Sequence, residues 1–362
     1  MKQRFKDHIV KMRRYQTSTG RDLETGLRLD RNERVMDANN SLLEKLWQSM
    51  PSSILHVTPD VGELYDRIAA YEGVDRNKIY LGQGITECIR FLYETLTEPG
   101  ENVVVLDPTY PMYMVYAELF ELEYRRFVYG QDHRPLMQSL YDNCDDKTAI
   151  VAIANPNLPI ESALTRDELR KIAAHCQSLG AILAVDEAYH HFGAESAIPL
   201  VDEFSNVVVM RTFSKAWGMA GIRLGYMISQ PQNIEYLSKT RSLVETNAFS
   251  MTAAMFALDH PELMSDHVAE VKDGAAFLRA GLDKMGVAWH GGEYTNGIMI
   301  FMRTTEEARR MVADLRAQNI YIRGAFEPPY DSCIRVSLGG VPAMERFLDA
   351  FQACRARVAA AS

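Results

Sequence analysis

Short apolar runs rich in β-branched residues recur between residues 78 and 229, and longer helix-like segments separate several of them. The runs are residues 78–82, 102–107, 148–154, 181–188, 206–212 and 223–229. Continuous apolar runs of this length are typical of strands that are buried on both faces of a sheet. Strands of this kind, alternating with helices, form a mainly parallel sheet between two layers of helices. The sequence therefore predicts an α/β fold.

Two of the intervening segments, residues 86–96 and 165–180, are predicted to be helices. Thr165 begins the second segment and Glu168 follows three residues later, which is the spacing of a capping box. Gly180 ends it, as glycine commonly ends helices because it tolerates the left-handed conformation. The predicted strands and helices between residues 78 and 229 therefore alternate along the chain, as in an α/β domain.

The pattern changes after about residue 265. A helical stretch (268–286) precedes a strand-like run (298–303), a second helical stretch (306–319) and two further strand-like runs (320–324 and 333–339). This order indicates a smaller α+β domain, which the first 35 residues or so are expected to join. We therefore expect an N-terminal arm (1–35), a large domain (36–264) and a small C-terminal domain (265–362).

Composition excludes several classes of protein. The formal net charge of −9 disfavours nucleic acid as a partner, because proteins bind phosphate backbones through clustered Lys and Arg. Lys11, Arg13 and Arg14 gather near the N-terminus, and we interpret them as a solvated arm. No apolar run reaches the roughly 20 residues that span a bilayer, and the charged N-terminus lacks the apolar core of a secretory signal. An odd count of five cysteines argues against a disulfide framework, so we expect a cytoplasmic protein without a membrane partner.

Ligands of parallel α/β sheets bind at the carboxyl ends of the strands, so the residues there are the first candidates. Gly84, Ile85 and Thr86 follow the first run and open a helix, whose free N–H groups can bind an anion. Many strand–helix turns share this pattern. Tyr110 follows the second run between two prolines, where its ring either stacks on a flat ligand or caps the core.

The next two strand ends are also polar. Residues 155–159 (NPNLP) form a stiff turn, which simple turn chemistry also explains. Asp186 follows an apolar run, and a buried carboxylate is costly unless it has a cationic or hydrogen-bonding partner. Tyr189 follows three residues later. The neighbouring His190 and His191 would point to opposite sides of a strand, so we expect no metal site.

Lys215 stands just beyond the run 206–212. A desolvated lysine amine forms imines with carbonyl compounds. Thr212 and Ser214 offer hydroxyl groups, and Arg223 offers a guanidinium that can bind a phosphate bidentately. A lysine in a loop is unremarkable when taken alone. Together, an imine-forming lysine, a phosphate site, an aromatic ring and a buried carboxylate are what pyridoxal 5′-phosphate (PLP) requires of a protein.

From about Leu29 to the C-terminus the chain resembles the fold-type I, class I/II PLP-dependent aminotransferases, most closely the histidinol-phosphate aminotransferase group. The segments that carry the resemblance are RTFSKAWGMAGIRLGY (211–226), DEAY (186–189), GQGITE (82–87), PTYPMY (108–113), CIRVSLG (333–339), IYIRG (320–324) and LRLDRNER (27–34). The resemblance implies a large PLP-binding domain with a mainly parallel seven-stranded sheet and a smaller α+β C-terminal domain. It also implies a homodimer whose sites lie at the subunit interface.

The resemblance implies catalytic roles for four residues. Lys215 would join the PLP aldehyde, Asp186 would face the pyridine nitrogen and Tyr189 would face the phenolic oxygen. Tyr110 would cover the ring face. The other cofactor-binding residues it implies are Gly84, Ile85, Thr86, Asn157, Thr212, Ser214 and Arg223.

Three further residues are implied at the substrate. Arg335 would bind the carboxyl-end group of the substrate, Arg323 would contact a substrate phosphate, and Asn32 would lie near the substrate. The expected reaction moves an amino group between a small anionic amine or amino acid, phosphorylated or not, and a 2-oxo acid. Glutamate and 2-oxoglutarate are the expected second pair.

The sequence departs from the family pattern at two places. The usual turn NPNNPTG is NPNLPIE here, so Leu158 replaces the asparagine that hydrogen-bonds the phenolic oxygen of PLP. Losing that bond is expected to raise the pKa of the lysine–PLP imine by about one to two units. The second departure is Thr58, where the family usually has a tyrosine that reaches the phosphate of the partner subunit's cofactor. Tyr65 is the candidate substitute.

The sequence leaves two other functions open. The same scaffold supports decarboxylases of amino-acid phosphates and C–S lyases, because the bond held perpendicular to the PLP ring is the one that breaks. A different placement of Arg323 and Arg335 would favour decarboxylation. A nucleotide-binding or regulatory α/β module is disfavoured, since no G-x-G-x-x-G follows the first strand.

Overall fold

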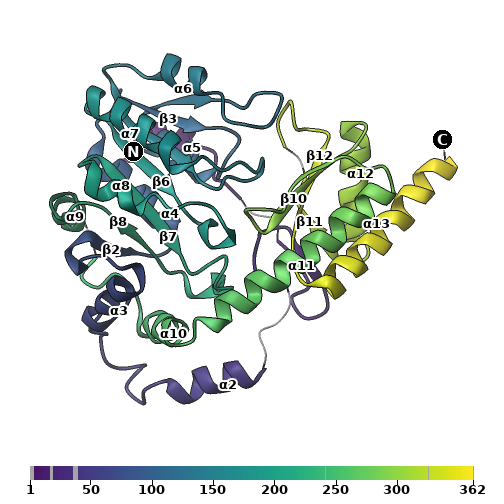
Figure 1. Ribbon diagram of the computed structural model, residues 1–362, viewed down its shortest axis with the longest axis horizontal. Coiled ribbons are helices and arrows are strands. Elements are labelled where there is room, and N and C mark those ends of the chain that lie inside the picture. The colour runs from purple at the N-terminus through teal and green to yellow at the C-terminus, as the bar shows by residue number, and fades with distance from the viewer. Residues whose placement is uncertain (1–3, 17–18, 36–39, 241, 325, 362) are drawn as a thin grey trace.

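The structure is a computed structural model that describes residues 4–16, 19–35, 40–240, 242–324 and 326–361 (Figure 1). The strands of its large sheet are β2 (Ile79–Gly82), β3 (Asn102–Leu106), β4 (Glu123–Phe127), β5 (Thr148–Ala154), β6 (Ile182–Asp186), β7 (Val207–Thr212) and β8 (Gly225–Ile228). These seven strands lie in the order β2-β8-β7-β6-β5-β3-β4. β8 runs antiparallel to both neighbours, and all other neighbouring pairs are parallel. The predicted α/β fold with a mainly parallel seven-stranded sheet is confirmed.

Helices cover both faces of the large sheet, because side chains alternate between the faces along each strand. Within β7, Val207 and Val209 belong to one apolar core, and Val208 and Met210 belong to the other. One face carries α3 (Gly62–Glu72), α6 (Met137–Asn143), α7 (Arg166–Leu179), α8 (Ile198–Glu203) and α10 (Ala248–Asp259). The other carries α4 (Ile85–Leu96), α5 (Met112–Leu119) and α9 (Pro231–Leu237). We call the large sheet and these helices the large lobe.

The predicted helix signals of α7 are present in the structure. The Thr165 hydroxyl accepts a hydrogen bond of 3.2 Å from the Glu168 backbone N–H. The Glu168 carboxylate in turn accepts one of 2.8 Å from the Thr165 backbone N–H, which completes the capping box. Gly180 ends the helix with a φ of +74°, in the left-handed conformation that favours glycine.

A second, smaller group of helices and strands lies beside the large lobe (Figure 1). Its elements are β1 (Leu27–Leu29), β9 (Trp289–Gly291), β10 (Gly297–Phe301), β11 (Ile320–Ile322), β12 (Cys333–Ser337), α11 (Glu262–Lys284), α12 (Thr305–Arg316) and α13 (Val341–Ala361). The strands form an antiparallel sheet in the order β12-β10-β9 and a parallel pair of β1 with β11. They share one apolar core with the three helices. We call these elements the small lobe.

The pairing of β1 with β11 joins the N-terminal segment to the small lobe. Preceding it, α1 (Asp7–Lys11) lies beside α5 of the large lobe, and His8 forms an ion pair of 2.9 Å with Glu121. The predicted boundary between residues 264 and 265 falls inside the continuous helix α11. Met264 at that point contacts the cores of both lobes. The division into domains 1–35, 36–264 and 265–362 stays a prediction.

Three of the compositional predictions can be compared with the structure. All five cysteines are free. Lys11, Arg13 and Arg14 are exposed, as expected of a solvated arm. In the part of the chain that the structure describes, no helix is long and apolar enough to cross a bilayer. The cytoplasmic location and the absence of a nucleic-acid partner stay predictions.

Candidate active site

The candidate site lies where the carboxyl ends of the central strands of the large sheet meet the small lobe. Asp186 is the last residue of β6, and Thr212 is the last residue of β7. Lys215 follows β7 by three residues and contacts the segment that leaves β1 of the small lobe. The strand-end rule therefore places these predicted residues together, as the sequence suggested.

Lys215 is half-buried, and its Nζ donates hydrogen bonds of 3.1 Å each to the carbonyl oxygens of Arg31 and Asn32. Burial lowers the pKa of Lys215 to about 8, and the neighbouring cations of Arg335 and Arg223 act in the same direction. An amine with this pKa is largely neutral slightly above pH 8. It is therefore suited to act as a nucleophile toward an aldehyde and as a base.

Asp186 is buried at 4% exposure and has two hydrogen-bond donors. The backbone N–H of Ala188 donates at 3.0 Å, and the hydroxyl of Tyr113 donates at 3.1 Å. Burial raises the pKa of Asp186 to about 6, because the charged form loses solvent, although both hydrogen bonds act against the shift. A buried carboxylate of this kind is stabilised by a cation, such as the protonated nitrogen of a pyridine ring.

Tyr189 lies between Lys215 and the small lobe. Its hydroxyl accepts a hydrogen bond of 2.9 Å from the side-chain amide of Asn32. The Nζ of Lys215 lies 5.7 Å from the centre of the Tyr189 ring. Burial raises the pKa of Tyr189, so the phenol stays protonated. Its hydroxyl can therefore donate a hydrogen bond to a ligand oxygen. The predicted pair of Lys215 and Tyr189 is thus brought together.

The predicted anion site is also assembled. Gly84 precedes α4 with a φ of +79°, and a Cβ at this position would lie 3.0 Å from Nη2 of Arg223. Glycine therefore leaves room beside the guanidinium, where the first N–H groups of α4, including those of Ile85 and Thr86, face outward. Arg223 itself is exposed and adopts the left-handed conformation, with a φ of +52°. A phosphate group would fit between a cation and the start of a helix.

Hydroxyl groups border this anion site. The Thr212 hydroxyl donates to the Ser214 hydroxyl at 2.9 Å. The Tyr110 and Thr86 hydroxyls form a hydrogen bond of 2.9 Å. Burial raises the pKa of Tyr110, while the cation of Arg223 lowers it, which puts the two side chains on the same side of the site. The predicted phosphate-binding residues therefore form one group.

Arg335 lies on β12 of the small lobe and faces the same space. Its Nη2 donates a hydrogen bond of 2.8 Å to the carbonyl oxygen of Asp30. Its Nε is buried and has no hydrogen-bond acceptor within the described residues. Burial lowers the pKa of Arg335, and the cation of Arg323 adds to this effect. Arg323 and Arg335 are neighbours, because their backbones exchange hydrogen bonds of 3.0 and 2.7 Å.

Asn157 makes its hydrogen bonds within the protein. Its amide nitrogen donates to the carbonyl oxygens of Pro108 and Ile160, each at 3.0 Å, and to the Tyr129 hydroxyl at 2.5 Å. Its amide oxygen accepts from the Thr109 hydroxyl at 2.5 Å. Asn157 therefore holds the turn after β5 in shape, and its predicted contact with the cofactor stays a prediction.

The two departures from the family pattern can be located. Leu158 is buried at 7% exposure and lies against Gly297 of β10, where a Cβ would be 3.0 Å from its Cδ1. Thr58 is exposed. Tyr65 is turned into its own subunit, since its hydroxyl accepts a hydrogen bond from Leu81 and donates one of 3.1 Å to Glu245. The structure gives no support to Tyr65 as a substitute for the usual tyrosine.

A buried ionic network lies behind the site. Arg211 precedes Thr212 and is buried at 4% exposure. Its guanidinium donates to Glu187 at 2.8 Å and also binds Glu72, so each of the two carboxylates has the same cation as its partner. Glu187 is the residue after Asp186. The network therefore fixes the ends of β6 and β7 against each other.

His190 and His191 lie in a 3₁₀ turn rather than on a strand, because Tyr189 already leaves the extended conformation of β6. Their rings face each other, with centroids 4.1 Å apart. The Tyr71 hydroxyl hydrogen-bonds Nε2 of His191 at 3.0 Å. Burial lowers the pKa of His191 to about 3 and also lowers the pKa of His190. Both imidazole rings are therefore neutral at pH 7. In the part of the chain that the structure describes, no three His, Cys, Asp or Glu side chains are grouped so that they could hold a metal ion.

Sequence reasoning missed two residues that border the site, Tyr113 and Tyr15. Tyr113 donates to Asp186 and lies within the motif PTYPMY, which had drawn attention only to Tyr110. Tyr15 of the N-terminal arm raises the pKa of both Arg335 and Tyr110, which places its hydroxyl near both. Asn32 was predicted near the substrate, but its hydrogen bond to the Tyr189 hydroxyl was not predicted.

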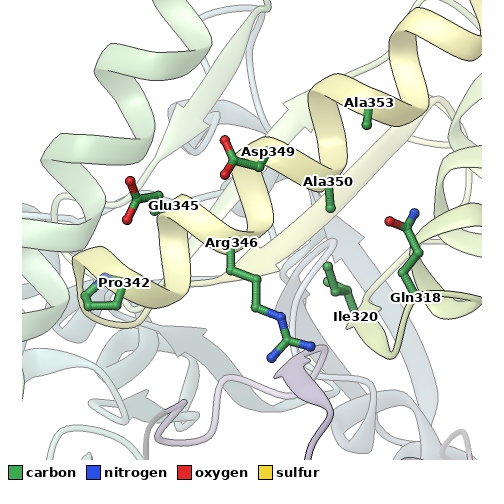
Figure 2. A pocket seen from close by; sticks show the side chains of 8 residues that line it. All are labelled: Gln318, Ile320, Pro342, Glu345, Arg346, Asp349, Ala350 and Ala353. Atoms are coloured by element: carbon green, nitrogen blue, oxygen red, sulfur yellow. The ribbon is translucent and has the colours of Figure 1, made fainter.

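A groove elsewhere on the small lobe has no part in this site. It has a volume of about 580 Å³ and lies between α13 and β11 (Figure 2). Its lining includes Glu345, Arg346 and Asp349, which carry both signs of charge, and none of the predicted site residues. The predicted site residues therefore lie at the strand ends and not in this groove.

The residues at the strand ends fit PLP. Lys215 has an amine whose lowered pKa, about 8, makes the neutral form that an aldehyde requires accessible, Asp186 is a buried carboxylate, and Gly84 leaves an open cradle beside Arg223. Among cofactors, PLP is the one that combines an aldehyde, a basic ring nitrogen and a phosphate. The fold and this site define a PLP-dependent enzyme.

Comparison with known proteins gives the family. Residues 24–351 match the sequence profile of the family described as aminotransferase class I and II, and the chain belongs to this family. It is a PLP-dependent transaminase. A curated relative, the histidinol-phosphate aminotransferase of Christiangramia forsetii, is 27% identical over 297 residues, which cover 81% of this chain and 83% of the relative. The predicted family resemblance is confirmed.

Solved structures show the same fold. The histidinol-phosphate aminotransferase from Sinorhizobium meliloti, crystallised with pyridoxal-5′-phosphate, has a TM-score of 0.86 and 23% identity and covers 98% of each chain. The L-threonine-O-3-phosphate decarboxylase from Porphyromonas gingivalis has a TM-score of 0.73 and 21% identity, covering 90% of this chain and 98% of its own. Transaminases and a decarboxylase therefore share this scaffold, and the fold alone does not select between the two reactions.

Proposed function

We propose that the protein transfers an amino group between a small phosphorylated amine or amino acid and a 2-oxo acid, with glutamate and 2-oxoglutarate as the second pair. The observation that supports an anionic substrate is that Nε of Arg335 is buried and has no hydrogen-bond acceptor among the described residues. A buried donor without an acceptor is costly, and a substrate carboxylate or phosphate would satisfy it. Arg335 lies close enough to Lys215 to lower its pKa, so an anion bound there lies next to the reacting amine.

Arg323 supports a second negative charge on the substrate. Its backbone is paired with that of Arg335, and its cation lowers the pKa of Arg335. Two neighbouring guanidinium groups repel each other unless an anion lies between them. A phosphate, which carries up to two charges near neutral pH, neutralises both arginines better than a single carboxylate does. The relatives named for histidinol phosphate make that ester the first compound to test.

Bound PLP supplies a ring that accepts the electrons left when a proton leaves the substrate Cα. Lys215 takes that proton on Nζ and releases it later in the cycle, since its pKa of about 8 suits both steps near neutral pH. Asp186 would hold a proton on the ring nitrogen. Tyr189 would donate a hydrogen bond to the phenolic oxygen, and Tyr110 would exclude water from one face of the ring. Gly84, Thr212, Ser214 and Arg223 would hold the phosphate.

A single-turnover experiment tests the reaction. Purified protein with PLP is mixed with L-histidinol phosphate, other phosphorylated amines or L-glutamate, without a 2-oxo acid. Transamination produces one equivalent of keto product and one of pyridoxamine phosphate. Release of carbon dioxide with PLP unchanged, when the donor is an amino-acid phosphate, would contradict transamination and favour decarboxylation.

Variants of the two arginines test the substrate class. Arg335→Lys keeps a positive charge but loses the planar fork, and it is expected to raise KM for every anionic donor at least tenfold. Arg323→Met is expected to raise KM for phosphorylated donors more than KM for glutamate. Equal effects of Arg323→Met on phosphorylated and unphosphorylated donors would contradict a phosphate subsite at Arg323.

We propose further that the protein is a homodimer. Large apolar side chains are exposed near α2 (Asn40–Ser49), the loop that follows it and α10: Trp47 at 61%, Leu55 at 81%, Val57 at 55%, Leu243 at 94% and Phe249 at 41%. In Figure 1, α2 projects from the large lobe beside α10. A monomer seldom exposes so much apolar surface in one region, and a second copy would bury it. Sedimentation of the purified protein measures the oligomer, and Leu55→Glu is expected to shift it toward monomer.

A further inference from the structure

Both ends of the Asn32 side chain are occupied by protein groups. The amide nitrogen donates to the Tyr189 hydroxyl at 2.9 Å. The amide oxygen accepts from the Ser337 hydroxyl at 2.9 Å, and the residue as a whole is only 3% exposed. Ser337 also accepts a hydrogen bond of 2.8 Å from the Asn32 backbone N–H, so its own proton is directed to the amide oxygen. The sequence placed Asn32 at the substrate, whereas its amide is directed at Tyr189.

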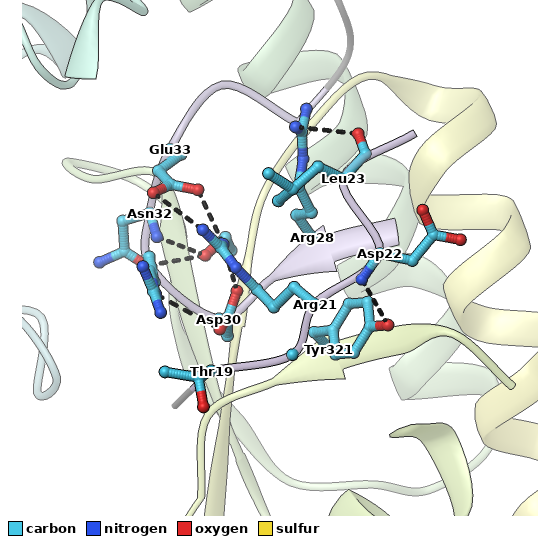
Figure 3. Close-up of polar contacts among 12 residues, drawn as sticks. Thr19, Arg21, Asp22, Leu23, Arg28, Asp30, Asn32, Glu33 and Tyr321 are labelled. Atoms are coloured by element: carbon cyan, nitrogen blue, oxygen red, sulfur yellow. Dashed lines mark hydrogen bonds and ion pairs between the residues drawn. The ribbon is translucent and has the colours of Figure 1, made fainter. Parts of the chain in front are cut away.

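The turn that carries Asn32 is held from several sides. Arg21 donates to the carboxylates of Asp30 at 3.0 Å and Glu33 at 2.8 Å, on either side of Asn32 (Figure 3). Arg335 donates to the carbonyl oxygen of Asp30 at 2.8 Å. Figure 3 shows that the turn follows directly after β1, which is paired with β11. The position of the Asn32 amide is therefore fixed by the surrounding protein.

The backbone of Asn32 contacts the lysine itself. Its carbonyl oxygen accepts from Nζ of Lys215 at 3.1 Å and from the side-chain amide of Asn296 at 3.1 Å. Its φ of +54° lies in the left-handed region, which asparagine tolerates better than most residues with a Cβ. The left-handed turn lets one residue direct its carbonyl group to Lys215 and its amide to Tyr189.

The donor at Tyr189 changes what that phenol can do. A hydroxyl oxygen that accepts one hydrogen bond becomes a stronger donor of its own proton, because consecutive hydrogen bonds polarise one another. With Asn32 occupying one acceptor position of the oxygen, the proton of Tyr189 remains for a ligand. Leu158 is also close to Asn32, since a Cβ at Gly297 would lie 3.0 Å from Leu158 Cδ1 and 3.6 Å from Asn32 Oδ1. Leu158 and Asn32 therefore both lie against Gly297 of β10.

We propose that Asn32 is a positioning residue that acts through Tyr189: it directs the Tyr189 hydroxyl toward the phenolic oxygen of PLP and strengthens the hydrogen bond donated there. The inference rests on the proposed roles of Lys215 and Tyr189. It deepens the proposed function, because the same hydrogen bond stabilises the deprotonated phenolic oxygen and so controls how readily the lysine-bound cofactor holds a proton.

The test is the pH midpoint at which the visible absorbance of bound PLP changes. Asn32→Gly removes the amide and keeps the left-handed backbone, so the carbonyl contact to Lys215 is preserved. It is expected to raise the midpoint by about 0.5 to 1 pH unit, because a weaker bond from Tyr189 favours the protonated form. Asn32→Asp keeps the shape but replaces the donor with a negative acceptor, and it is expected to raise the midpoint further.

A double-mutant cycle assigns the effect to Tyr189. In the Tyr189→Phe background, Asn32→Gly is expected to shift the midpoint by no more than about 0.2 pH unit, since the two changes remove one interaction. Asn319 also has a positive φ, of +58°, but it is exposed and distant in sequence, so Asn319→Gly is the matched control for the backbone effect. The control is expected to leave the midpoint unchanged.

The outcomes separate this inference from its alternatives. An unchanged midpoint in Asn32→Gly, with KM for the amino donor raised, would overturn it and assign Asn32 to the substrate. An equal shift with and without Tyr189 would also overturn it. A different result would contradict the proposed function, namely a Lys215→Ala variant that retains the visible absorbance of covalently bound PLP. Asn32→Gly is expected to retain that absorbance whether or not the inference about Asn32 is correct.

Discussion

The carboxylate of Glu161 accepts a hydrogen bond of 2.6 Å from the hydroxyl of Thr295. It also accepts backbone N–H hydrogen bonds of 3.1, 3.0 and 3.1 Å from residues 292, 293 and 294. Glu161 follows β5 of the large lobe, and Thr295 lies in the turn between β9 and β10 of the small lobe. One buried carboxylate therefore connects the two lobes, at the position where relatives usually have the glycine of NPNNPTG.

Replacing Glu161 with glutamine is expected to destabilise the protein by about 2–3 kcal/mol. The amide cannot accept on both sides, so at least one N–H group of the turn would face an NH₂ group. The residue is 6% exposed, so water does not replace the lost bonds. Urea denaturation of the holoenzyme measures the change. Glu293→Gln, an exposed carboxylate in the same turn, is the control and is expected to change the stability by less than about 0.5 kcal/mol.

Asp186→Asn is expected to stabilise the cofactor-free protein at pH 8 while abolishing transamination. Burial raises the pKa of Asp186 from 3.8 to about 6, so keeping it ionised in the folded state costs free energy above pH 6. The contribution of this carboxyl group to the free energy of unfolding is fully present below about pH 4 and is lost as the pH rises through 6. The shift corresponds to as much as about 3 kcal/mol.

Urea denaturation of the cofactor-free protein at pH 5 and pH 8 checks the Asp186 prediction. The gain from Asp186→Asn should be larger at pH 8 than at pH 5. Asp266→Asn, on an exposed position of α11, provides the matched control. A gain that is the same at both pH values would show that the substitution acts through packing and not through charge.

Lys215 of the cofactor-free protein is expected to react with an acylating reagent with a midpoint near pH 8. Its pKa is lowered to about 8, mainly by burial, and the neutral amine is the reactive form. Mass spectrometry of the labelled peptide measures the reaction at this one residue. Lys171, an exposed residue of α7, is the internal reference. The argument from burial is wrong if Lys215 and Lys171 show the same pH dependence.

Leu158→Asn is expected to lower the pH midpoint of the absorbance of bound PLP by about one to two units. Asparagine has nearly the shape of leucine, and at this buried position its amide would donate to the deprotonated phenolic oxygen. The direction is opposite to that expected for Asn32→Gly. Leu158→Met, which keeps an apolar side chain of similar volume, should leave the midpoint within about 0.3 unit of the parent value.

Sequence periodicity predicted the buried strands because each is a continuous apolar run. Strand β4 (Glu123–Phe127, EYRRF) was missed, since it lies at the edge of the large sheet and carries Arg125 and Arg126. Charged residues are common on edge strands, where they discourage pairing with other chains. A pattern search for apolar runs therefore finds the centre of a sheet and overlooks its edge.

The candidate site was predictable where a chemical group stands at a strand end, as for Asp186 and Lys215. It was not predictable where two segments distant in sequence meet. The hydrogen bond between Asn32 and Tyr189 joins residues 157 positions apart, and the one between Tyr113 and Asp186 joins residues 73 apart. Such contacts depend on how the lobes pack, which no local pattern encodes.

Helix α11 makes the molecule difficult to divide. It extends for 23 residues, about 34 Å, and its residues contact the cores of both lobes. Near its beginning, Nδ1 of His267 donates a hydrogen bond of 2.8 Å to the carbonyl oxygen of Ala216, the residue after Lys215. A fragment that ends before α11 would keep the strand ends but lose this support beside the lysine. Chimeras that exchange small lobes between relatives would therefore have to take α11 and the loop of Lys215 from the same parent.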